Sequence, residues 1–248
     1  MSKITEFENA VADYTSSPYA VGMDSCTSCI YNSLKFFDVT NVVLPRQTFI
    51  SIYTHAVLAR AKVQFTDNHW ESCYKIEPTE IYDCAKKFES KMYVPGTVMC
   101  LSFGKDKPLS IFNENHTLRG GMLLTDNKDL ATYARDNLQC TIPRTRTCER
   151  NFFNLQSNQS MVEAEADIGL HLLETQDKFE CGEITWEHYS DLSEFKLLKI
   201  KDRVKIISHS NKPSDRWILD NAKYISSVPL MQTMRGCRAV HMIDEDSE

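Results

Sequence analysis

The order of apolar segments along this chain predicts an α/β domain with a mainly parallel sheet covered by helices. Short apolar runs typical of buried strands alternate with stretches of helical spacing. A hydroxyl-rich turn separates the first strand from the helix after it, and polar side chains follow several other strands. With 248 residues, 42% of them hydrophobic, the chain is long enough for one large domain with a small appendage.

The elements are expected in the following order. Apolar residues recur at helical spacing from Ile4 to Tyr14, and Pro18 ends this first helix. The elements expected next are strand 20–23, helix 29–37, strand 41–44, helix 49–60, strand 62–66, strand 81–82, strand 97–103, strand 120–125, helix 127–137 and helix 161–174. Residues 139–158 are polar and have no clear period, whereas residues 196–207 are compatible with either a helix or a strand.

Charge and hydropathy narrow the class of protein. The formal net charge is −6, so the composition offers no basic surface for nucleic acid. No apolar run approaches the roughly 20 residues that a membrane span needs. The first residues lack the apolar core of a secretion signal. We therefore expect a cytoplasmic protein without nucleic-acid or membrane partners.

The nine cysteines are an odd number and lack the dense spacing of a disulfide scaffold. Cys26 and Cys29 form a C-x-x-C pair, but no second pair at short spacing completes a zinc site. A metal or redox role is the less favoured interpretation of this pair. We expect both cysteines to be small core residues near the start of a helix, and we predict no metal site.

Several polar side chains occupy positions that suit lysine Schiff-base chemistry. This chemistry needs a lysine, an acidic partner for a pyridine nitrogen, a phosphate cradle and a flat side chain against the ring. In an open α/β sheet such groups lie on loops at the carboxyl ends of strands. The candidates after expected strands are Thr27, Ser28, Phe49, Asp83 and the turn from Ser102 to Lys107.

Seven segments in a fixed order carry a family resemblance. They are VGMDSCTS at 21–28, VLPRQTF at 43–49, ARAKVQFTD at 59–67, IYDCAK at 81–86, SFGKDK at 102–107, RGGMLLTD at 119–126 and NQSM at 158–161. Together they resemble the DegT/DnrJ/EryC1/StrS family of sugar aminotransferases, which depend on pyridoxal 5′-phosphate (PLP). The resemblance implies the aspartate-aminotransferase fold, PLP fold type I, over roughly residues 4–180.

The resemblance also implies a role for each matched residue. Lys107 corresponds to the Schiff-base lysine that moves the proton, and Asp83 to the partner of the pyridine nitrogen. Lys86 stands where the family has Gln or His near the ring oxygen. The remaining implied contacts are Thr27, Ser28 and Ser102 on the phosphate, Phe49 on the ring face, and Asn158 on the phosphate of a neighbouring subunit.

Other interpretations of these residues stay open. Taken alone, Lys107 also fits a solvated loop lysine, and Lys105 lies two residues away. Phe49 fits the hydrophobic core equally well, and Asp83 fits a cap at the end of a strand.

The chain departs from the family in two places. Only sixteen positions separate Asp67 from Asp83, where the family inserts at least one more strand and helix. Little after Lys178 matches the family's small carboxyl-terminal domain. We therefore expect a PLP-binding domain at 1–180 with a sheet thinned beside the cofactor, and a reduced segment at 181–248.

The expected activity follows from the resemblance. We expect an aminotransferase that moves an amino group from a donor, glutamate in the family, to a nucleotide-linked ketosugar through a Lys107 aldimine, and that works as a homodimer. Arg144, Arg146 and Arg150 either form a solvated face or bind the nucleotide-sugar diphosphate. The alternative is a non-catalytic, truncated relative that serves as a binding or assembly protein.

Overall fold

The computed structural model describes residues 2–111, 118–138, 159–176, 178–179, 186–194, 206–207 and 241–242. The chain divides into two compact units, 1–192 and 193–248. In the second unit β8 (Ile206–Ile207) pairs antiparallel with β9 (His241–Met242). The site residues described below all belong to the first unit.

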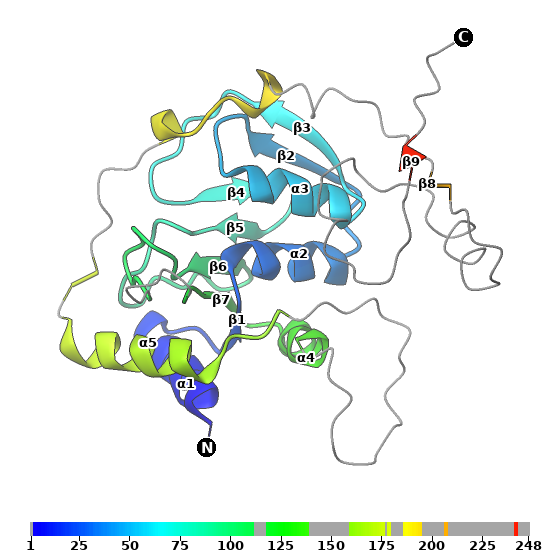
Figure 1. Cartoon of the computed structure of the whole chain (residues 1–248). Helices are drawn as coiled ribbons and strands as arrows, with labels where there is room; N and C mark the ends of the chain where they lie inside the picture. Colours follow the sequence, from blue (N-terminus) through cyan, green and yellow to red (C-terminus); the bar gives the residue numbers. More distant parts are fainter. Residues whose placement is uncertain are drawn as a thin grey trace, which may run out of the picture. The chain divides into compact units, whose positions relative to one another are not determined.

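The first unit is built on a sheet in which five strands lie in the order β1-β7-β6-β5-β4 (Figure 1). Their bounds are β1 Tyr19–Met23, β4 Tyr74–Ile76, β5 Ile81–Asp83, β6 Val98–Ser102 and β7 Gly121–Thr125. A second pair, β2 (Asn41–Pro45) and β3 (Lys62–Thr66), is parallel. The Val43 amide donates to the Glu77 carbonyl at 2.7 Å, which joins β2 to the end of β4.

The prediction of a mainly parallel sheet was wrong. The pairs β5–β6 and β2–β3 are parallel, but β1–β7, β6–β7 and β4–β5 are antiparallel. A parallel pair needs a long crossover, usually a helix, whereas antiparallel strands can follow each other directly. In the described part of the chain no α-helix lies between β3 and β7, so the β-α alternation assumed from the amino-terminal half ends at β3.

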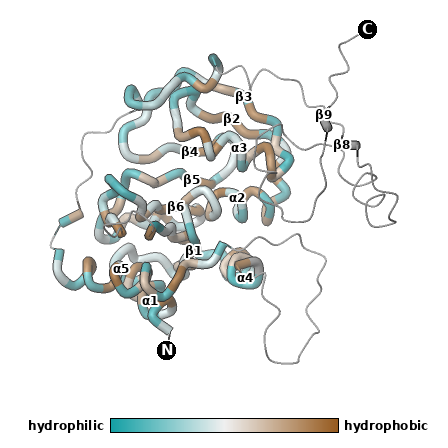
Figure 2. Tube along the Cα trace, in the orientation of Figure 1, coloured by the Kyte–Doolittle hydropathy of each residue, from teal (hydrophilic) through white to brown (hydrophobic). Residues whose placement is uncertain are grey.

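Helices cover both faces of the sheet (Figure 1). One face carries α2 (Cys26–Phe36), α3 (Ile50–Leu58) and α4 (Lys128–Asn137), whose buried residues share one core cluster. The other face carries α1 (Lys3–Thr15) and α5 (Glu163–Thr175), which pack with the segment after β5. Hydrophobic residues recur along the strands and the helices that meet them (Figure 2). The sheet is therefore buried between two layers, and only its ends are available for a site.

Local chemistry explains where the helices begin and how closely they pack. Side-chain oxygens of Ser2, Ser25 and Asn127 accept the amides that a helix leaves unpaired at its start. A Cβ at Gly169 would lie 2.4 Å from the Phe7 ring, so the lack of a side chain there lets α5 approach α1. Two short 3-10 turns, Trp186–His188 and Leu192–Glu194, follow later in the chain.

Most expected elements are present with nearly the expected bounds. Strand 62–66 was predicted with the bounds of β3, whereas α2 begins at Cys26, one turn earlier than expected. Strand β4 was not predicted. It lies beside β5 at the end of the five-stranded sheet, and the expected thinning of the sheet relative to the family stays a prediction. Among the described residues, no helix is long and apolar enough to span a bilayer.

Candidate active site

Strand register brings the candidate residues to one edge of the sheet. Met23 at the end of β1 lies opposite Gly121 at the start of β7, and Gly121 lies opposite Ser102 at the end of β6. On the next strand, Asp83 ends β5 and pairs with Cys100. The hydroxyl turn, Asp83 and the turn that carries Lys107 therefore start from neighbouring positions along this edge.

The amino-terminal end of α2 lies directly against this edge. A Cβ at Gly121 would lie 2.3 Å from the carbonyl carbon of Ser25 and 2.4 Å from the amide nitrogen of Cys26. The absence of a side chain at Gly121 thus allows the helix start to touch the strand. Because first-turn amides and the helix dipole favour negative charge, this end of α2 suits an anion such as phosphate.

The hydroxyls of this turn already have partners. The Thr27 and Ser51 hydroxyls lie 2.7 Å apart, which ties α2 to α3. The Ser28 hydroxyl donates to Asp24 Oδ1 at 2.5 Å, and the Ser25 hydroxyl donates to the same oxygen at 3.0 Å. Asp24 thus places a carboxylate beside the helix start and accepts hydrogen bonds from two of its hydroxyls.

Gln159 holds this turn through its backbone and its side chain, a role that was not predicted from the sequence. The Asp24 backbone amide donates to the Gln159 carbonyl at 2.8 Å, and Met23 forms an isolated antiparallel β-bridge with Ser160. The Gln159 side chain accepts from the Asn32 amide at 2.6 Å in the buried interior. Its position directly after Asn158 in the NQSM segment was the available signal.

Asp83 is a buried carboxylate, only 5% exposed. Its Oδ1 accepts the Ala85 amide at 3.0 Å and the Cys26 thiol at 3.6 Å. Burial raises the pKa of Asp83, while its hydrogen bonds and the positive charge of Lys107 act in the opposite direction.

A chain of two hydrogen bonds ends on the other oxygen of Asp83. The Tyr74 hydroxyl donates to Asp83 Oδ2 at 3.0 Å, and its oxygen lies 2.7 Å from the Thr48 hydroxyl. Burial, followed by the nearby Asp83 charge, raises the pKa of Tyr74 well above its ordinary value. Because the phenol keeps its proton for Asp83, Thr48 is the donor to Tyr74. Thr48 lies in the VLPRQTF segment, although no role was predicted for it, and no motif includes Tyr74.

The turn after β6 carries Lys107 and is held by Lys86. Lys107 is partly buried, and Asp106 before it has a positive φ of 61°, which marks a tight turn. Lys86 is only 5% exposed, and its Nζ donates to the Asp106 carbonyl at 2.9 Å. Lys86 thus supports the Lys107 turn, whereas its contact with a cofactor ring stays a prediction.

The remaining predicted residues have different outcomes. Phe49 precedes the first residue of α3 and is 56% exposed, so it is not a core residue and is accessible to a ligand. Its stacking role stays a prediction. Asn158 and the arginines at 144, 146 and 150 lie outside the described residues. Cys26 and Cys29 are buried in the core at the start of α2, as expected.

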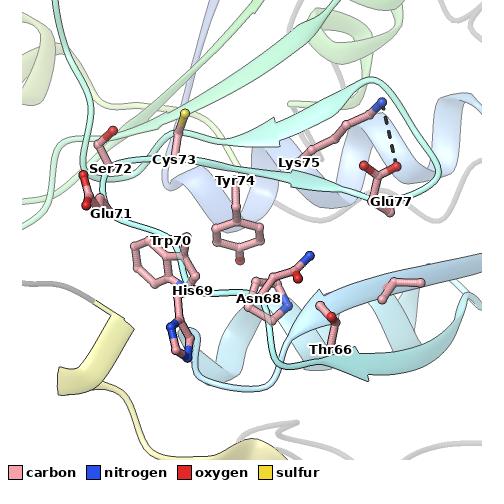
Figure 3. A pocket seen from close by; sticks show the side chains of 12 residues that line it. Thr66, Asn68, His69, Trp70, Glu71, Ser72, Cys73, Tyr74, Lys75 and Glu77 are labelled. Carbon is pink, nitrogen blue, oxygen red and sulfur yellow. Dashed lines mark ion pairs between the residues drawn. The ribbon is translucent and has the colours of Figure 1, made fainter.

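A pocket of about 450 Å³ is lined by residues of β2, β3, β4 and the segment that leads into β4 (Figure 3). Trp70, His69 and Tyr74 are among the residues that line it. The His69 ring stacks on Trp186 with centroids 3.7 Å apart, and the Trp70 indole donates to the Gln47 carbonyl at 2.8 Å. Tyr74 therefore borders this pocket and also reaches Asp83.

Comparison with known families gives a direct result for the first third of the chain. Residues 2–87 match the model of the DegT/DnrJ/EryC1/StrS aminotransferase family. The resemblance is confirmed over these residues. The matched range includes Thr27, Ser28, Phe49, Asp83 and Lys86, whereas Lys107 follows it. None of the curated proteins compared with this chain matches it.

Solved structures extend the similarity to the fold. PseC of Helicobacter pylori, an aminotransferase involved in the biosynthesis of pseudoaminic acid, is 12% identical with a TM-score of 0.56 over 70% of this chain and 58% of its own. A putative sugar aminotransferase of Streptococcus pneumoniae in its PLP form is 14% identical, with a TM-score of 0.54 over 70% and 59%. NtdA of Bacillus subtilis, with bound pyridoxamine phosphate, is 16% identical, with a TM-score of 0.53 over 70% and 48%.

These comparisons confirm the aspartate-aminotransferase-like fold and, through the PLP and pyridoxamine-phosphate forms, the cofactor class of the family. The chain is also shorter than these proteins, since it spans less than two thirds of the length of each of the three structures. The similarity at this level of identity concerns the fold alone.

Proposed function

We propose that this chain is a PLP-dependent aminotransferase that transfers an amino group from glutamate to a nucleotide-linked ketosugar. The observation that carries the proposal is the buried Asp83 carboxylate at the end of β5, whose charged form is favoured by the positive charge of Lys107. The turn that carries Lys107 follows the adjacent strand β6, and the amino-terminal end of α2 lies against the same edge of the sheet. The domain at 1–180 contains all of these groups.

The chemistry of the side chains present fits PLP. When bound, PLP supplies an aldehyde for a lysine and a protonated ring that accepts electrons. Lys107 has the amine for the aldehyde, and Asp83 has the carboxylate that accepts a hydrogen bond from the ring nitrogen. The first-turn amides of α2, with Thr27 and Ser102, supply donors for the phosphate. The absence of a side chain at Gly121 supports this cradle, since a Cβ there would push α2 away.

Lys107 would also act as the acid and base of the reaction. An amine freed from its covalent bond can take a proton from the donor's α-carbon and return it to the product. The hydrogen bond from Lys86 to the Asp106 carbonyl fixes the turn from which Lys107 would do so. Phe49, exposed at the start of α3, is available to cover one face of the ring.

A non-catalytic binding or assembly protein is the second candidate, and two contacts favour it. The Tyr74 hydroxyl occupies Asp83 Oδ2, and the Asp24 carboxylate takes the Ser25 and Ser28 hydroxyls. Both contacts use groups that the cofactor would need. The short length relative to the solved structures points the same way.

Covalent attachment of PLP is the test of the first proposal. We expect the full chain mixed with PLP to develop an absorption band in the violet, and borohydride reduction to fix the cofactor on Lys107. Trypsin separates the two competing lysines, because residues 106–119 contain Lys107 as their only lysine. An adduct on Lys105 would instead block cleavage and yield residues 92–119.

Two lysine variants and the addition of an amino donor complete the test. Lys105→Ala should retain the adduct, and Lys107→Ala should lose it while the protein stays folded by circular dichroism. Addition of glutamate should then convert the violet band in a single turnover. An adduct elsewhere, or none, rejects the role of Lys107. A correct adduct that no amino donor converts supports the non-catalytic candidate.

A further inference from the structure

Cys73, just before β4, and Cys84, just after β5, lie opposite each other on the side of the sheet away from the Asp83 side chain. Tyr74 of β4 pairs with Asp83 of β5 in antiparallel register, so the next position along is Cys73 opposite Cys84. Residues directly opposite in such a pair have Cα atoms roughly 4.5–5.5 Å apart. Disulfide-linked cysteines have Cα atoms roughly 4.4–6.8 Å apart, a range that this register allows. The two thiols also shift each other's pKa, as neighbouring side chains do.

Alternation along the strands separates this pair from the candidate active site. The Cys73 sulfur points away from the Tyr74 ring in Figure 3. Cys84 is fully buried in the core on the α1 side of the sheet, whereas Cys73 is partly exposed and borders the pocket. Cys73 is thus the more exposed of the two cysteines, and Cys84 is the buried one.

The two thiols differ in reactivity. The hydrogen bond from Cys84, together with the positive charge of Lys87, lowers the pKa of Cys73 to about 7 despite partial burial. The same hydrogen bond, followed by burial, raises the pKa of Cys84 well above its ordinary value. A thiol with a pKa near 7 is about half thiolate at neutral pH, and the thiolate is the nucleophile in disulfide exchange.

The other cysteines of the described residues are protected. Cys26, Cys29 and Cys100 are buried, and burial raises the pKa of each thiol well above its ordinary value. The C-x-x-C spacing of Cys26 and Cys29 therefore does not produce a reactive pair in this fold. Of these five cysteines, Cys73 is the one that a small oxidant can reach as a thiolate.

We propose that Cys73 and Cys84 are a redox-modification site that forms a reversible disulfide by exchange with a small-molecule disulfide such as oxidised glutathione. The Cys73 thiolate attacks one sulfur of the oxidant, whose S–S bond breaks and releases one glutathione thiolate, which takes up a proton. Cys84 then loses its proton, attacks the Cys73 sulfur of the mixed disulfide and releases the second glutathione. The two protein thiols are oxidised by two electrons, and the glutathione disulfide is reduced to two thiols.

The test uses the full chain in glutathione buffers of increasing oxidised fraction, quenched with acid and alkylated. Trypsin places Cys73 in residues 63–75 and Cys84 in residues 76–86, so a disulfide appears as a linked pair of these two peptides. We expect both alkylated peptides to be lost together and the linked pair to take their place. The peptide 92–105, which contains Cys100, is the internal control and should stay alkylated throughout.

The order of events gives a second measurement on the unmodified protein. In a time course, the glutathione adduct of peptide 63–75 should appear first and decay as the linked pair forms. Cys84→Ser should stop at this adduct, and Cys73→Ser, a change at a partly exposed position, should leave Cys84 reduced. The proposal is overturned if wild-type Cys73 retains glutathione as Cys84→Ser does, or if both thiols stay reduced in oxidised glutathione alone. Neither outcome depends on whether the chain binds PLP.

Discussion

Replacing Tyr74 by Phe removes one hydroxyl from the buried group around Asp83 and keeps the ring. The hydroxyl donates to a charged oxygen at 3.0 Å and accepts from Thr48 at 2.7 Å. A hydrogen bond to a charged group contributes about 1.5–3 kcal/mol, and a neutral one about 1 kcal/mol. We therefore expect Tyr74→Phe to lower the free energy of unfolding by about 3 kcal/mol, which corresponds to a fall in Tm of about 6–12 °C for a domain of this size.

Urea and thermal unfolding measure this loss, and the neighbouring strand supplies a matched control. Tyr82 is adjacent to Asp83 on β5, partly exposed and directed to the opposite face. Tyr82→Phe should change the free energy of unfolding by no more than about 0.5 kcal/mol. If both variants lower the free energy of unfolding equally little, the Tyr74 hydroxyl makes no net contribution to stability. The buried hydrogen bonds from Thr48 through Tyr74 to Asp83 then do not stabilise the fold.

The same variant distinguishes two roles for Tyr74 at the cofactor. Its hydrogen bond favours the ionised form of Asp83, so its loss should raise the pKa of Asp83 and weaken the pairing with a protonated ring nitrogen. We expect PLP affinity, measured by titration of the violet band, to fall about tenfold, a change of about 1.4 kcal/mol. A rise in affinity would mean that Tyr74 occupies the position the ring nitrogen needs, and would favour the non-catalytic candidate.

Two further predictions concern pH and assembly. Burial raises the pKa of Asp83 above its ordinary value of 3.8, so the folded protein keeps this proton to higher pH than the unfolded chain, and stability from this group falls as pH rises through the raised pKa. Asp83→Asn cannot ionise, so its free energy of unfolding relative to wild type should increase as the pH rises from the ordinary pKa of an aspartate through the raised pKa of Asp83 in urea titrations; a constant difference would contradict the raised pKa. The role implied for Asn158 requires a two-fold symmetric homodimer. Light scattering at micromolar concentration checks this, and the mass of a single chain would count against it.

Local patterns were sufficient where neighbouring residues decide the structure. Alternating apolar runs located β1, β3 and β7, and the hydroxyls of the Asp24–Ser28 turn indicated the start of α2 because capping depends on adjacent amides. Motif order also selected Asp83 and Lys107, which the structure brings within electrostatic range of each other. These features depend on residues close in sequence or on a pattern shared with the family.

Features that depend on distant partners could not be predicted. Strand direction is set by which strands become neighbours, and the pairing of β7 with β1 brings together segments about 100 residues apart. The contacts of Gln159 with Asp24 and Asn32 are of the same kind. No local pattern marks a residue whose partner lies across the fold.

The short segment between Asp67 and Asp83 determines two contacts beside the candidate site. A segment this short has no room for a crossover helix, so its last residues turn back as β4, antiparallel to β5. Strand alternation then decides what β4 presents on each face. Tyr74 points to the α2 side and reaches Asp83, while Cys73 points to the α1 side and meets Cys84. The hydroxyl on the carboxylate and the dithiol behind it therefore have a common cause, and a change that displaces β4 should alter both the pKa of Asp83 and the reactivity of Cys73.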